Sequence, residues 1–363
     1  MGKRKTMYFS GQIFLNGGFQ EGYVAVENGI ICRIGRGFCP EKPAAKGIIL
    51  PTFINAHTHI GDSAVRFEPL PSDSFMEIVA PPDGLKHRAL RELTENEIVA
   101  GMKRSINDML ASGTSHFCDF RECGVTGVHH LRKSLRCETI GCIVLGRPAR
   151  HEYKKDELLS ILEIADGIGV SSISDWDYGT LQRIAKLAHD RRKMFAIHAS
   201  ERVREDIDKI LDLKPAFLVH MNEATENDLI LCAAEKIPIV ICPRSNLFFG
   251  KLPDIPRAVR SGCTVMLGTD NAMLARPDMF LELETAYRTA RMRGGLKTGE
   301  ILEMATTNAR KVFNAEGNTG LSEGRKADFL VLAGEMKHPG FEVVVHASSM
   351  KIIYMESGIT VGI

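Results

Sequence analysis

The stretch Leu50-Pro51-Thr52-Phe53-Ile54-Asn55-Ala56-His57-Thr58-His59 is an apolar run that ends in two histidines separated by one residue. Alternate residues of a β-strand point to the same side, so His57 and His59 are expected to aim two imidazoles at one point beyond the strand's end. A metal site can begin in this way. Two surface histidines would give the same short pattern, so the rest of the chain has to decide between these interpretations.

Short apolar runs of strand length alternate with helix-like segments from about residue 46 onward. Two of the helical segments open with a capping-box pattern, at Thr94 and at Thr225. Eight strands, each followed by a helical segment, predict an α/β fold, a (β/α)8 TIM-type barrel. An open doubly wound sheet is the alternative, but no glycine-rich phosphate loop follows the first strand. The predicted strands are 47–59, 114–120, 139–146, 167–174, 194–200, 216–221, 238–243 and 264–270.

Both ends of the chain contain short apolar runs typical of β-strands. Near the start, Glu27-Asn28-Gly29 lies between two β-rich runs, which is a strong signal for a hairpin. Near the end, 320–332 and 351–361 are further strand-like segments. Neither end is large enough to bury a core alone. We therefore predict one composite β-sandwich module from residues 1–48 plus 316–363, beside a barrel of residues 49–315.

Composition excludes several classes of partner. The chain has 363 residues, 46 of them basic and 45 acidic, so its formal net charge is only +1. Such a balance produces no strong electrostatic field that would attract a nucleic acid or a membrane surface. A small molecule is therefore the expected partner. No run approaches the roughly 18 apolar residues of a membrane span. Nine scattered cysteines without a CxxC pattern fit reduced thiols, and we expect a cytoplasmic protein.

The candidate catalytic and metal-binding residues lie at the ends of the predicted strands, where the active sites of barrels lie. His57 and His59 end the first strand, His198 the fifth, His220 the sixth and Asp270 the eighth. Taken singly, His198 or His220 fits a core histidine, and Asp270 fits a turn cap. The coincidence of all five at corresponding positions indicates one site.

This order of residues on such a barrel resembles the amidohydrolase superfamily, in particular its cytosine deaminase and triazine hydrolase branch. The resemblance runs almost end to end and includes the first ten-residue stretch quoted above. Its other parts are His198-Ala199-Ser200-Glu201, Cys242-Pro243-Arg244-Ser245-Asn246, Gly268-Thr269-Asp270 and Gly324-Arg325-Lys326-Ala327-Asp328. These motifs are specific for the superfamily and branch, and not for the substrate.

The resemblance also implies a metal. Members with two metals bridge them with a carboxylated lysine at the end of strand 4, but here that strand, 167–174, contains no lysine. We therefore expect one divalent ion, held by His57, His59, His198 and Asp270. Zinc is favoured, with iron or manganese as alternatives.

The expected mechanism is hydrolysis by a metal-activated hydroxide, because a bound metal lowers the pKa of water from about 16 to near 7. Asp270 would act as general base. Glu201 resembles the acid that shuttles a proton in deaminases of this branch, although a first-turn glutamate favoured by the helix dipole is the alternative. His220 would polarise the attacked centre or orient the water, with contact to the metal left open.

Substrate contacts are indicated by arginines that follow strands 2, 3 and 7. Arg121, Arg147 and Arg244 could recognise an anionic group such as a carboxylate or phosphate, or could instead pair with a loop carboxylate such as Glu122. Asn246 is a further candidate for the pocket wall.

The predicted function is deamination of an amino-substituted heterocycle of the pyrimidine, purine, pterin or triazine type. One alternative is a hydrolase of cyclic amides or other C–N bonds. Another is a barrel that has lost catalysis and serves as a binding or assembly module, although all the expected ligands are present. By family resemblance, a homodimer is the expected oligomeric state.

Overall fold

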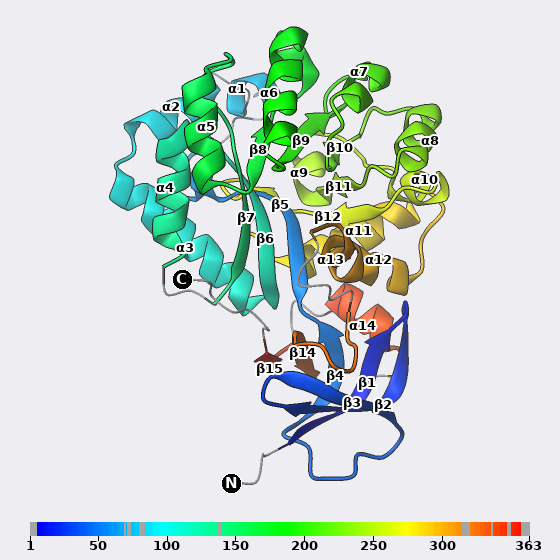
Figure 1. Cartoon of the computed structure of the whole chain (residues 1–363). Helices are drawn as coiled ribbons and strands as arrows, with labels where there is room; N and C mark the ends of the chain where they lie inside the picture. Colours follow the sequence, from blue (N-terminus) through cyan, green and yellow to red (C-terminus); the bar gives the residue numbers. More distant parts are fainter. Residues whose placement is uncertain are drawn as a thin grey trace.

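The computed structural model describes residues 6–68, 70, 74–79, 84–136, 139–313, 320–334, 337–346 and 350–356. Two sheets organise this part of the chain, and Figure 1 shows the smaller sheet at the lower end, apart from the helices that surround the larger one. The predicted boundary between residues 315 and 316 and the end of the predicted strand 351–361 lie outside the described residues.

The larger sheet has nine strands, and all its neighbouring strands pair in parallel. It curls back on itself, because β12 and β13 stand at opposite ends of the strand order and are joined by only Gly268 and Thr269. The eighth predicted strand is thus one segment that pairs with β11 through its first half and with β5 through its second. The strands are β5 (Phe53–His59), β6 (Thr114–Arg121), β7 (Gly141–Gly146), β8 (Gly167–Val170), β9 (Met194–Ala199), β10 (Leu218–His220), β11 (Ile239–Ile241), β12 (Val265–Leu267) and β13 (Asp270–Asn271).

Helices follow the strands, as the periodicity predicts. The side chains of Thr94 and Thr225 form the two predicted capping boxes, at the starts of α3 and α8. In the described ranges, no helix is both long and apolar enough to cross a bilayer. The helices are η1 (Ile60–Ala64), α1 (Phe75–Ile78), α2 (Leu85–Glu92), α3 (Glu95–Ala111), α4 (Gly124–Ser134), α5 (Lys155–Ile164), η2 (Ile173–Asp175), α6 (Tyr178–Asp190), α7 (Ile207–Asp212), α8 (Glu226–Ala234), α9 (Pro243–Phe248), α10 (Ile255–Arg260), α11 (Met279–Arg291), α12 (Thr298–Ala305), α13 (Thr307–Phe313) and α14 (Pro339–His346).

A shift of register in β5 determines where the first histidines point. Asn55 pairs with Phe117 and Thr58 pairs with Asp119, so β5 has one residue more than β6 over this stretch. Ile54 and Ala56 belong to an apolar cluster contributed by alternate residues of the strands. The extra residue re-aims the chain, as β-bulges do, and the His57 ring packs 4.5 Å from that of Phe120 in the same cluster.

The smaller sheet combines strands from both ends of the chain, as predicted. It is a single six-stranded sheet in the order β15-β14-β4-β1-β2-β3, and the two-layered sandwich is not confirmed. The Asn28-Gly29 hairpin joins β2 to β3 as expected. The predicted first strand, 47–59, is divided at Thr52 into β4 of this sheet and β5 of the larger one. The strands are β1 (Met7–Leu15), β2 (Gly18–Glu27), β3 (Ile30–Arg36), β4 (Ala45–Pro51), β14 (Phe329–Ala333) and β15 (Ile352–Glu356).

A buried polar junction joins the two sheets at Thr52. The Arg310 side chain, fully buried on α13, donates to the carbonyl oxygen of Thr52 at 2.7 Å and to its hydroxyl oxygen at 2.7 Å. The same guanidinium lies 2.6 Å from Asp328, whose main-chain carbonyl accepts from the Thr52 N–H at 3.3 Å. Asp328 directly precedes β14, so this one ion pair ties an outer helix to both sheets.

Replacing Asp328 by asparagine is expected to destabilise the protein by about 3–5 kcal/mol, because it leaves the Arg310 charge buried without its partner. The quantity to measure is the free energy of unfolding in a denaturant titration. The matched control is Asp190→Asn, which breaks an exposed pair with Lys186 and should leave the midpoint nearly unchanged. Equal effects of the two substitutions would contradict the role of the junction.

Candidate metal centre and active-site cavity

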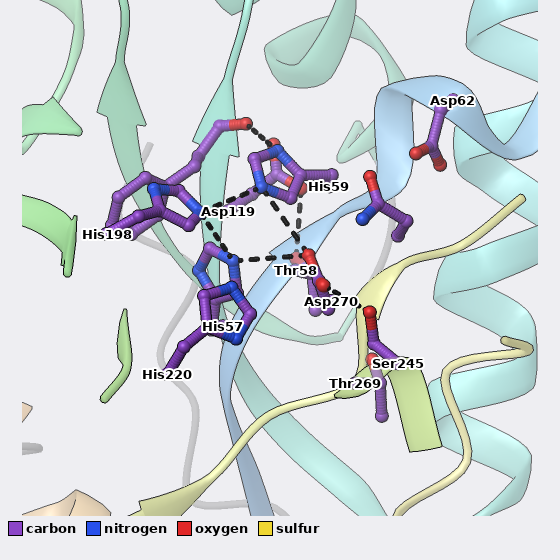
Figure 2. A network of polar contacts seen from close by, with 12 residues as sticks. His57, Thr58, His59, Asp62, Asp119, His198, His220, Ser245, Thr269 and Asp270 are labelled. Carbon is purple, nitrogen blue, oxygen red and sulfur yellow. Dashed lines mark hydrogen bonds and ion pairs between the residues drawn. The ribbon is translucent and has the colours of Figure 1, made fainter. Parts of the chain in front are cut away.

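Four side chains from three strand ends converge on one point. His57 Nε2 lies 3.2 Å from His198 Nε2 and 3.4 Å from Asp270 Oδ1. His59 Nε2 lies 3.4 Å from His198 Nε2 and 3.6 Å from Asp270 Oδ1. Figure 2 shows the three imidazoles turned toward one another and toward the carboxylate. The sequence-predicted ligands are therefore brought together, and all four are buried.

The hydrogen bonds behind the rings determine which nitrogens carry lone pairs. His198 Nδ1 lies 2.8 Å from the carbonyl oxygen of Val170, and His59 Nδ1 lies 3.0 Å from that of Phe120. A carbonyl oxygen can only accept, so each Nδ1 carries the hydrogen. Burial, reinforced by Lys86, lowers the pKa of His59 to about 3, and burial with His57 nearby also holds that of His198 well below its usual value. Both rings are neutral, and each Nε2 presents a lone pair.

Two lone pairs that face each other at 3.4 Å cannot hydrogen-bond, so the arrangement fits a cation between them. Tetrahedral zinc with bonds of about 2.0–2.1 Å would place its ligand atoms about 3.3–3.4 Å apart. The separations of His57 and His59 from His198 and from Asp270, 3.2 to 3.6 Å, are close to this spacing. The donor set of imidazoles with one carboxylate is also typical of catalytic zinc sites.

Asp270 is oriented from behind by Ser245. Its Oδ2 accepts the Ser245 hydroxyl, which leaves Oδ1 to face the imidazoles. Burial alone would raise the pKa of Asp270, but the contacts with the neighbouring histidines, His57 first and then His220, outweigh burial. The pKa is held well below its usual range, so Asp270 is an anion at neutral pH.

A second pair, His220 and Glu201, borders the cluster. His220 Nε2 lies 3.3 Å from Glu201 Oε1, and His220 Nδ1 lies 3.0 Å from the amide nitrogen of Asn246. Burial lowers the pKa of His220 to about 4. Burial, together with the charge of Asp270, raises the pKa of Glu201 well above its usual value. The raised pKa favours the protonated form of Glu201, which can donate a proton.

Left-handed backbone recurs at these strand ends. Ser200, His220 and Asp270 have φ values of 45°, 79° and 61°, a region that side chains other than glycine rarely adopt. Such residues cost on the order of 1–3 kcal/mol each and cluster at functional sites. Here they end the strands abruptly at the point where the side chains converge.

The convergent residues open onto a cavity of about 630 Å³, part of which is open to solvent. His59, His198, Glu201, His220 and Asp270 all line it. The remaining wall is mixed. Phe75 of α1 and Val79 contribute apolar atoms. The charged groups are Lys86 of α2, Arg147, Asp175 and Arg202.

The predicted substrate contacts are only partly placed on this wall. Arg147 lines the cavity, whereas Arg121, Arg244 and Asn246 do not. Arg121 is buried against Glu122 and Asp119, which was the alternative considered for the arginines. Arg244 turns away and donates to the carbonyl oxygen of Arg276 at 2.8 Å. Asn246 lies behind His220.

A buried charge cluster lies beside His59. The sequence indicated Glu122 only as an alternative partner of the arginines, and its contacts with His59 and Lys86 were missed. Glu122 Oε1 lies 2.9 Å from His59 Nδ1, 2.7 Å from Lys86 Nζ and 2.9 Å from Arg147 Nη2. Burial alone would raise the pKa of Glu122, but the surrounding cations hold it well below its usual range. Glu122 follows β6 directly, so its position at a strand end was a usable signal. Lys86 lies on α2, where nothing in the sequence marks it.

The chain matches the amidohydrolase family over residues 48–357. An uncharacterized protein of Methanocaldococcus jannaschii is 35% identical over 350 residues, covering 90% of this chain and 88% of the relative. A 5-methylthioadenosine/S-adenosylhomocysteine deaminase of Caldicellulosiruptor saccharolyticus is 26% identical over 359 residues, covering 86% and 80%.

The fold is also similar to that of a solved atrazine chlorohydrolase from Arthrobacter aurescens, complexed with zinc. The TM-score is 0.76 at 14% identity, with 93% of this chain and 91% of that chain covered. That structure shows the fold alone, and the relatives do not single out one branch of the superfamily. The chain belongs to the metal-dependent amidohydrolase family, and it is an enzyme that hydrolyses C–N bonds.

Proposed function

We propose that the enzyme deaminates an amino-substituted heterocycle at the cluster described above. The observation that carries the proposal is the position of Glu201, a carboxyl group 3.3 Å from His220 on the same cavity wall as Asp270, and burial raises the pKa of this group. Release of an amine requires an acid beside the attacked carbon as well as a base for the water. A relative named as a deaminase of adenosine derivatives agrees with an amino-substituted purine or a similar ring.

In this proposal one divalent ion, preferably zinc, is held by His57, His59, His198 and Asp270. When bound, such an ion lowers the pKa of water to near 7 and polarises the attacked group. The buried lone pairs of His59 and His198 support the assignment. Asp270 would have a second task, because its Oδ1 faces both the imidazoles and the cavity.

The residues around the cavity would divide the proton transfers. Asp270 accepts the proton of the attacking water at Oδ1, while the Ser245 hydroxyl holds Oδ2. His220 presents Nε2 to the attacked centre, because Asn246 occupies the space at Nδ1. Glu201 gives its proton to the ring nitrogen or to the leaving amine. Asn246 thus positions His220 in this scheme, instead of contacting substrate as its place in the sequence indicated.

Other parts of the sequence prediction remain proposals. They are membership of the cytosine deaminase and triazine hydrolase branch, an anionic substrate bound by Arg147, a homodimer and a cytoplasmic location. The division into a barrel of 49–315 and a module of 1–48 plus 316–363 is also a proposal.

The first test is ammonia release from a panel of aminopyrimidines, aminopurines, aminopterins and aminotriazines, with the zinc, iron and manganese forms. At least one form should release ammonia, and Asp270→Asn should abolish release. Ring opening of cyclic amides is measured in parallel. If no form releases ammonia from the aminated rings and one form opens a cyclic amide, the proposal is wrong. The enzyme is then a hydrolase of cyclic amides.

Glu201→Gln is expected to lower kcat by about 10²- to 10⁴-fold, because the amide cannot donate the proton that the leaving amine needs. Metal content should be unchanged in this variant, since Glu201 lies outside the four-ligand set. Glu223→Gln serves as the control, because that glutamate pairs with Lys251 and does not line the cavity. A Glu201→Gln enzyme that keeps full kcat would remove Glu201 from the mechanism.

Glu122→Gln is expected to weaken metal retention by about 10- to 100-fold, because the carboxylate that orients His59 is lost. Competition with a chelator measures the change. Glu282→Gln is the matched control. Burial raises the pKa of Glu282 to about 8, so an uncharged amide resembles its native state. Equal metal affinity in the two variants would argue against a role for Glu122.

A further inference from the structure

A second and larger cavity lies on the other side of Arg147. It has a volume of about 1330 Å³, including space open to solvent, and it is formed by α2, the start of α4 and the segment that follows β7. Leu90, Pro148 and Ala149 give it apolar walls. The residues that carry the proposed reaction, His57, His59, His198, His220 and Asp270, do not line it. The cavity lies outside the proposed reacting centre, although Glu122, which contacts His59, lines it.

The lining of the second cavity is strongly basic. Arg91, Arg147 and Arg150 line it, and Glu122 is the only acidic residue among the described residues that do so. That carboxylate is already surrounded by Lys86 and Arg147, at 2.7 and 2.9 Å, and by Arg121. Among the described residues, basic side chains therefore outnumber acidic ones in this lining.

Two histidines of the wall respond to this charge. The pKa of His87 is lowered to about 3, mainly by burial and further by Lys86 and Arg147. The pKa of His151 is lowered by burial and then by Arg147. Neither ring adds a charge at neutral pH, but both offer nitrogen atoms for hydrogen bonds. The arginines supply the charge, and the histidines supply neutral polar contacts.

Arg147 is shared by the two cavities. Its side chain is about nine-tenths buried, and it pairs with Glu122, which also lines the second cavity and contacts His59. Arg91 and Arg150, in contrast, are exposed and line only the second cavity. A ligand there would meet two accessible guanidinium groups and, behind them, the one that reaches the active site.

We propose that the second cavity is a binding site for a small anion, with a phosphate or carboxylate group held by Arg91, Arg147 and Arg150 and an apolar part against Leu90 and Pro148. Planar guanidinium groups bind such oxyanions through paired hydrogen bonds, and apolar walls with a few placed charges are typical of ligand sites. The anionic group belongs either to the far end of the substrate or to a separate ligand.

The test uses phenyl phosphate, which combines a phosphate group with an apolar ring, in isothermal titration calorimetry with the metal-loaded enzyme. Binding with one equivalent is expected. The Arg91→Ala/Arg150→Ala double variant should weaken it at least tenfold, whereas Arg136→Ala, which removes an exposed arginine outside the cavity, should not. Both substituted positions of the double variant are exposed, and a melting curve checks that it remains folded. Absence of saturable binding, or equal affinity in the double variant, would overturn the proposal.

Kinetics on an identified substrate separate the two sources of the anion. If the substrate's own anionic group occupies the cavity, phenyl phosphate raises KM alone. If the cavity takes a separate ligand, phenyl phosphate changes kcat at constant KM. In either case the effect should disappear in the double variant, and an effect that persists there contradicts this site. Because the titration needs no turnover, it can fail or succeed independently of the proposed deamination.

Discussion

The facing lone pairs of His59 and His198 are the constraint on which the architecture of the site depends. Without a cation, buried acceptors that lack a donor cost about 1–3 kcal/mol each. They stay in place because main-chain carbonyls of neighbouring strands, at Phe120 and Val170, hold the opposite side of each ring. The register of the strands therefore fixes the positions of the imidazole rings. The unfavourable facing lone pairs lower the stability of the fold, and the same arrangement favours binding of a metal ion.

Much of this could be predicted from the sequence, because a parallel barrel couples strand order to site position. Apolar runs marked the strands, and the polar residues that end the first, fifth and eighth runs are the proposed ligands. The register shift in β5 could not be predicted in this way, since it depends on pairing with β6. The division of the first strand at Thr52 likewise depends on Arg310 and Asp328, which lie more than 250 residues away along the chain.

Long charged side chains were the least predictable part. Arg121 and Arg147 lie at the ends of adjacent strands and both pair with Glu122, yet only Arg147 also reaches a cavity wall. Their sequence neighbours do not distinguish them, because a guanidinium can extend in several directions and the nearest carboxylate in space decides. Lys86 comes from a helix that no motif marks. The strand ends could be located in advance, but not the partners of the flexible cations around them.

The break between β12 and β13 has a consequence for folding during synthesis. Asp270 reaches the site only when β13 pairs with β5, and the adjoining bond between Asn55 and Thr269 joins residues 214 positions apart. Contacts of such long range form slowly. During synthesis on the ribosome, Asp270 is added only after most of the chain, so the histidines of β5 are made long before the proposed ligand set is complete. Tight capture of a metal would then be a late event, and a sign that the ring of strands has closed.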